Sequence, residues 1–140
     1  MKLTSCVALL AVVGGTLALS AGHAETPEDW IKLGARVHGG FGAFIPAGIR
    51  IGLDALERLK AEPRGVTLTF YTGEKAPCPC IADGVMLATL ASPGQGTLQV
   101  AAEKAPPGLL AVVIVRDRKS GAGVRYSISG RMDGQDRRLE

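Results

Sequence analysis

Two cysteines and one histidine are the residues of this sequence whose side chains could do chemistry together. Cys78 and Cys80 flank a proline at the predicted start of a helix, and His38 precedes a group of glycines. A neutral imidazole and two thiolates suit Zn²⁺ or copper, and Asp83, three residues after Cys80, adds a carboxylate as a further ligand or as an acceptor that orients His38. The set indicates a transition-metal site and names no reaction.

Each of these residues also has an ordinary role that the sequence leaves open. Cys80 lies at or next to the N-cap of its helix, where the helix dipole favours a thiolate, but a free cysteine is often a small buried apolar residue. In an oxidising compartment, Cys78 and Cys80 could join in a disulfide. His38 could cap the last carbonyls of a helix, and Asp83 could bind the free N–H groups of a first turn.

The first 24 residues have the order of a secretory signal peptide. Lys2 supplies the positive start, residues 7–19 form an apolar stretch, and residues 22–24 are a small-x-small cleavage site. We expect a mature chain that starts at Glu25, is periplasmic or secreted, and loses Cys6 with the leader. The apolar stretch is shorter than the roughly 20 residues that span a bilayer, so no membrane span is expected after cleavage.

The mature chain is long enough for one compact domain and too short for two. We expect that domain over residues 25–130, followed by a charged, solvated tail over residues 131–140. The 16 Lys and Arg residues are interspersed with 13 Asp and Glu residues, for a net charge of +3. Because a nucleic-acid footprint needs clustered basic residues, we expect no nucleic-acid partner. A protein partner and the oligomeric state stay open.

The elements that must position the cysteines and the histidine follow from turn residues and apolar periodicity. Capping signals at Thr26 and Pro27 predict a short helix over residues 27–36, which leaves His38 at a helix-to-loop junction. Apolar residues at helical spacing predict the main helix from Pro46 to a stop near residues 63–65. The remaining predicted elements are a strand over 66–71, a loop to Pro79, a helix over 81–90, and strands over 97–101, 109–115 and 124–128.

This order predicts an α+β domain with a helix–strand–helix–three-strand core and a mixed sheet packed on helices. Residues 109–115 are expected to form the most central strand, because they are apolar on both faces. The predicted core includes the apolar residues on the inner faces of these elements: Ile49, Leu53, Leu56, Leu68, Phe70, Val85, Val113 and Val115.

The motifs of the chain resemble those of a domain family named for the formylmethanofuran dehydrogenase E subunit, and the resemblance covers roughly residues 30–118. That family commonly has a His-Gly-His-x-Cys-Pro-Gly opening, a Gly-x-Arg, a Cys-x-x-Asp-Ala segment that opens a second helix, and a glycine-rich turn into a strand. The matching positions in this sequence are His38-Gly39, Gly48 with Arg50, residues 80–84 (Cys-Ile-Ala-Asp-Gly) and residues 94–98 (Gly-Gln-Gly-Thr-Leu).

The resemblance implies the fold and a metal site in which His38 reaches Cys80 across the domain. The chain departs from the family at two positions, because Gly40 replaces the second histidine of the opening and Gly42 its first cysteine. Cys78 could compensate in part by adding a thiolate at the same end of the helix. We carry over the fold and the metal site, and not the dehydrogenase activity.

Three functions are therefore in competition. The leading hypothesis is an exported metal-binding domain that holds Zn²⁺ or copper through His38, Cys78 and Cys80, with no catalytic residues, and serves as a carrier or sensor for a partner protein. A thiol redox protein that cycles the two cysteines between dithiol and disulfide is the first rival. The second rival is a structural or interaction module that has lost the site.

Overall fold

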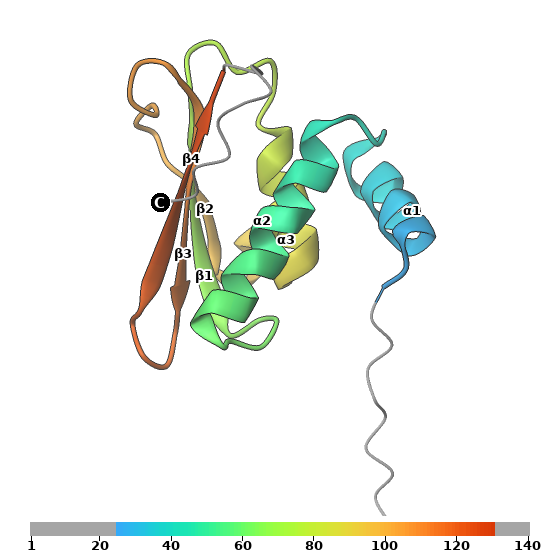
Figure 1. The fold of residues 1–140 in the computed structure, drawn as a ribbon, viewed down its shortest axis with the longest axis vertical. Helices are drawn as coiled ribbons and strands as arrows, with labels where there is room; N and C mark the ends of the chain where they lie inside the picture. The colour runs from blue at the N-terminus through green and yellow to red at the C-terminus, as the bar shows by residue number, and fades with distance from the viewer. Residues whose placement is uncertain (1–24, 131–140) are drawn as a thin grey trace, which may run out of the picture.

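The computed structural model describes residues 25–130, so the predicted leader with Cys6 and the predicted tail lie outside the described residues. Four strands form one mixed sheet in the order β2-β1-β3-β4, and α2 and α3 lie between this sheet and α1 (Figure 1). The elements are α1 (Pro27–His38), α2 (Phe44–Leu59), β1 (Val66–Thr72), α3 (Cys80–Thr89), the 3-10 helix η1 (Pro93–Gln95), β2 (Leu98–Val100), β3 (Leu109–Asp117) and β4 (Gly123–Ser129). The predicted α+β class and its element order are confirmed.

The sheet is mixed because α3 returns the chain in the direction of β1. β1 pairs with β2 in parallel, with Leu68 opposite Leu98, and pairs with β3 in the antiparallel sense. β3 was predicted to be the most central strand; it lies inside the sheet between β1 and β4, an interior position that it shares with β1, and Val112 and Val113 are both buried. Among residues 25–130, no helix is both long and apolar enough to cross a bilayer.

Helix α1 begins and ends on local signals that the sequence carries. The Thr26 hydroxyl accepts from the Asp29 N–H at 3.2 Å, and the Asp29 carboxylate accepts from the Thr26 N–H at 3.0 Å, which completes a capping box. The Thr26 hydroxyl also donates to the Asp29 carboxylate at 2.8 Å, and this bond, together with the one from the Thr26 N–H, lowers the pKa of Asp29. The helix ends at Gly39, whose φ of 84° is the left-handed conformation that glycine adopts most easily. His38 is thus the last residue of α1, two residues beyond the predicted end.

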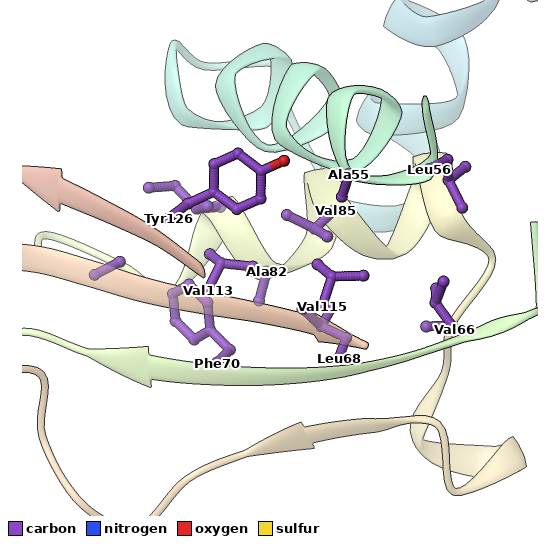
Figure 2. Close-up of a cluster of buried hydrophobic side chains, with 13 residues drawn as sticks. Ala55, Leu56, Val66, Leu68, Phe70, Ala82, Val85, Val113, Val115 and Tyr126 are labelled. Atoms are coloured by element: carbon purple, nitrogen blue, oxygen red, sulfur yellow. The ribbon is translucent and has the colours of Figure 1, made fainter. Parts of the chain in front are cut away.

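The core lies between the sheet and the two inner helices. Side chains from β1 and β3 point toward α3 and α2, and the largest among them is Phe70 at 1% exposure (Figure 2). Seven of the eight predicted core residues belong to this interior or to the adjoining cluster: Ile49, Leu56, Leu68, Phe70, Val85, Val113 and Val115.

Leu53 is the exception, and its assignment to the core was wrong because its side chain is 44% exposed. The inward face of α2 runs from Ile49 to Gly52 and then to Leu56, so a glycine occupies the inward-facing position one turn after Ile49. A pattern read from apolar side chains alone passes over that glycine and selects Leu53.

Helices α2 and α3 approach closely because both place small residues at their crossing. A Cβ at Gly48 would lie 2.9 Å from the Gly84 Cα and would overlap the carbonyl oxygen of Ile81. A Cβ at Gly52 would lie 2.7 Å from the Ala88 Cβ. The crossing therefore fixes where α3 begins, and Cys80 is the first residue of that helix.

A polar contact also joins the helical layer to the sheet. The Tyr126 hydroxyl of β4 donates to the Asp54 carboxylate of α2 at 2.5 Å, and the same oxygen accepts from Arg58 Nε at 2.7 Å. The Tyr126 hydroxyl and the Arg58 guanidinium hold the pKa of Asp54 below its usual value. Burial and the bond to Asp54 raise the pKa of Tyr126.

Candidate metal centre

Three soft donors meet where α1 ends and α3 begins. His38 is the last residue of α1, Cys78 lies in the loop before α3, and Cys80 is the first residue of α3. One ligand atom from each lies within 4.8 Å of the others. His38 is exposed, Cys78 is half-buried and Cys80 is buried, so the group faces solvent from one side. The structure thus brings together the histidine and cysteines that the sequence pattern indicated.

Asp83 holds the imidazole of His38 from the helix side. Its Oδ2 lies 2.7 Å from His38 Nδ1, and the two side chains are 38% and 30% exposed. Asp83 is on the first turn of α3, so the same turn supplies a thiol and the carboxylate contact to the histidine. With Nδ1 facing Asp83, Nε2 is the ring nitrogen left for a ligand, an arrangement common at histidine metal sites.

The two cysteine sulfurs are joined as a disulfide in this structure. The Cα atoms of Cys78 and Cys80 are 5.2 Å apart, within the usual range for a disulfide. A metal needs the thiolate form of cysteine, so the donor set fits Zn²⁺ or copper only when the pair is reduced. The geometry therefore accommodates both of the chemistries that the sequence left open for these residues.

An apolar cluster lies directly beneath the donors. Cys80 belongs to a buried group with Ile45, Ile49 and Ala88, and Cys78 packs against it. Trp30, which is partly buried, packs against the same cluster. The apolar surroundings limit water access to the buried sulfur. At metal sites in general, such surroundings control solvent access and the local dielectric.

The sequence interpretation missed how α1 is attached to the rest of the domain. Gly34 is buried, and a Cβ there would overlap the Phe41 ring and lie 3.0 Å from Ile45. Phe41 thus packs over the middle of α1 and helps to place His38 at its end. An isolated glycine within a helix was the available signal, since such a glycine is costly unless something approaches it closely.

Not every residue that the sequence singled out contributes to this site. Of the three glycines after His38, only Gly39 has a positive φ, and a Cβ at Gly40 or Gly42 would meet no atom within 4 Å. Packing therefore does not require glycine at those two positions. Arg50 is exposed on α2 and makes no ion pair with any of residues 25–130.

The family of the chain follows from a sequence comparison. A family model named FmdE and described as "Molybdenum formylmethanofuran dehydrogenase operon" matches residues 37–139, which is more than half of the chain and includes all four residues described above. The chain belongs to this family, as the motifs predicted. No curated protein is similar enough to the chain to count as a match.

Proposed function

We propose that the mature protein is an exported domain that binds one transition-metal ion, Zn²⁺ or copper, through His38, Cys78 and Cys80. The observation that carries the proposal is the convergence of these three donors within 4.8 Å, one from the end of α1, one from the loop before α3 and one from the start of α3. Three soft donors at one point, with a carboxylate on the imidazole, are typical of a metal centre. The match to the FmdE family supports the domain assignment.

The donor set supports metal binding and by itself names no reaction. Zn²⁺ usually takes four ligands, so three protein donors would leave a position for water or for a group from another molecule. His38 lies on the exposed side, where a partner protein can reach it. An ion held at such a site can be passed on or sensed, which is why we propose a carrier or sensor role for an exported partner.

A metal analysis of the exported protein tests this function. The full chain is expressed in an exporting cell and recovered under reducing and oxygen-free conditions. Its intact mass and its metal content are then measured. We expect a chain that starts at Glu25 and holds about one Zn²⁺ or copper ion. Cys80→Ser should abolish stoichiometric binding because it removes the thiolate at the start of α3, and His38→Ala should weaken binding.

Arg36→Ala is the matched control, because Arg36 is also exposed in the last turn of α1 and contributes no ligand. It should bind metal like the parent. Equal metal content in the parent and in Cys80→Ser would contradict the proposal.

A thiol redox protein is the second candidate, and the disulfide between Cys78 and Cys80 is the observation that favours it. A pure redox protein would exchange its disulfide rapidly with small dithiols and would bind no stoichiometric metal when reduced. The metal content of the reduced chain therefore separates the two candidates.

A further inference from the structure

We infer that the Cys78–Cys80 pair is a redox gate on the metal site, closed as a disulfide and opened by a dithiol reductant. This inference rests on the proposed metal-binding function and adds its regulation. The structure places both chemistries on the same two sulfur atoms, since Cys78 and Cys80 form a disulfide and also belong to the three-donor group with His38.

The two states exclude each other because each sulfur can serve only one of them. A sulfur in a disulfide has no thiolate charge to offer a metal. With the disulfide closed, His38 is the one donor of the group that remains, and its Nδ1 faces Asp83. A single imidazole is too small a ligand set to retain Zn²⁺ or copper against water. Oxidation therefore empties the site, and a bound metal protects the thiolates from oxidation.

The gate is local, so it can open without unfolding the domain. The disulfide joins residues two apart in sequence. Closing a loop this short removes little entropy from the unfolded chain, so the disulfide adds little to the stability of the fold. The elements around it are fixed by other contacts, notably the α2–α3 crossing at Gly48 and Gly84. The fold of residues 25–130 should therefore be the same in both redox states.

The exposure of the two cysteine residues points to the direction of the reaction. Cys78 is half-buried, whereas Cys80 is only 8% exposed. A thiolate of the dithiol therefore attacks the Cys78 sulfur, the bond between the cysteines breaks, and Cys80 leaves as a thiolate at the N-terminus of α3, where the helix dipole stabilises it. The second thiol then attacks the mixed disulfide and releases Cys78. The reductant becomes a disulfide, its electron pair reduces the protein, and its protons go to solvent or to the cysteines.

Metal binding by the two redox states of the parent chain tests the gate. The full exported chain is prepared in a fully oxidised and a fully reduced form. Thiol titration and an intact-mass difference of two hydrogen atoms distinguish the two forms. Each form is freed of reductant and dialysed without oxygen against Zn²⁺ and, separately, against Cu⁺. We expect about one ion per reduced chain. The oxidised chain loses two ligands, so its metal affinity should fall by more than the roughly 10–100-fold that follows the loss of a residue that only orients a ligand. Dithiothreitol should restore binding.

Each outcome decides a different point. Equal metal binding by both states would overturn the gate and leave the metal-binding function standing. Binding by neither state would overturn the metal-binding function, and the gate with it. Circular dichroism of both preparations checks that the fold is retained, so lost binding is not mistaken for unfolding.

Mixed-disulfide formation tests the direction of attack. Cys78 in the Cys80→Ser chain should react with an oxidised small thiol at least roughly tenfold faster than Cys80 in the Cys78→Ser chain, because access limits the reaction. If either variant fails to fold, alkylation of the reduced parent followed by peptide mapping gives the same comparison. Equal rates at the two sulfurs would refute attack at Cys78.

Discussion

At the scale of single residues, the contact between Asp83 and His38 decides how the imidazole is presented. The 2.7 Å separation between Asp83 Oδ2 and His38 Nδ1 leaves Nε2 as the ring nitrogen that could bind a ligand, and it restricts rotation of the ring. Both side chains are about one-third exposed, so the contact matters for orientation more than for fold stability. Any effect of Asp83 on metal binding is therefore expected to come from the orientation that it gives to His38.

Shortening Asp83 should therefore weaken metal binding without unfolding the domain. We expect Asp83→Ala to lower the affinity of the reduced chain by about 10–100-fold, and Asp83→Asn to lie between it and the parent because an amide oxygen still accepts from Nδ1. Competition with a chromophoric chelator measures the affinity. Glu57→Gln, which removes an exposed carboxylate from α2, is the control. Parent-like affinity in Asp83→Ala would show that the carboxylate has no orienting role.

The donors themselves could be predicted from the sequence, whereas the redox state of the cysteines could not. The mature chain was expected to contain few groups that bind soft metals, and the family resemblance implied that His38 reaches Cys80. Whether Cys78 and Cys80 are ligands or a disulfide depends on the surroundings of the protein, because the same two sulfurs suit either state. Gly34 signalled that something packs closely on α1, but its partner Phe41 could not be predicted, since that depends on how α1 turns into α2.

At the scale of elements, the crossing of α2 and α3 fixes the position of the site. The backbones of the two helices meet at Gly48 and Gly84, and Cys80 and Asp83 lie on the turn of α3 that ends at this contact. A side chain added at the crossing would push against backbone atoms, which cannot move aside as a flexible side chain can. Fold and site should therefore be damaged together.

Gly84→Ala should destabilise the domain and weaken metal binding. A Cβ there would lie 2.8 Å from the Gly48 Cα and 2.9 Å from the Ile49 N, so we expect a loss of about 1–3 kcal/mol, despite the roughly 1 kcal/mol that alanine gains over glycine in a helix. Urea unfolding measures the loss. Gly94→Ala is the control, because a Cβ at that position meets no atom within 4 Å. Equal stability of the two variants would mean that the helices can separate at little cost.

The elements were predictable in type and order, but the face of α2 was not. Apolar periodicity and turn residues identified every helix and strand of the α+β core within a few residues. The inward face of α2 runs through Gly48 and Gly52, and glycine carries no hydrophobic signal that a periodic pattern can register. That is why Leu56 was placed correctly and Leu53 was not.

At the scale of the whole molecule, Tyr126 and Asp54 link the helical layer to the sheet across the core. Tyr126 is 8% exposed and points from β4 toward α2 (Figure 2), where its hydroxyl donates to the Asp54 carboxylate. Arg58 donates to the same oxygen from the solvent side. Because the contact joins two layers, its loss should appear in the global unfolding of the domain.

The stability given by this contact should depend on pH at both ends of the scale. The folded-state pKa of Asp54 is lowered, so its contribution is present above the unfolded value of about 3.9 and is lost as the pH falls through the folded value. The folded-state pKa of Tyr126 is raised, so its contribution is present below the unfolded value of about 10 and is lost as the pH rises through the folded value. Between these limits the contribution is constant.

Tyr126→Phe tests this expectation, because it removes the hydroxyl and keeps the ring. We expect a loss of roughly 1–2 kcal/mol near pH 7, since a bond to a charged group is worth more than a neutral one while the carboxylate is partly solvated. Urea unfolding from about pH 3 to pH 9 should show the difference between parent and variant narrowing below about pH 4, where Asp54 becomes protonated in the unfolded chain. Tyr71→Phe, in strand β1 of the same sheet, is the control, and its difference from the parent should be small at every pH. A Tyr126→Phe loss that stays constant into acid would show that the hydroxyl stabilises the domain in some way other than its bond to the ionised Asp54 carboxylate.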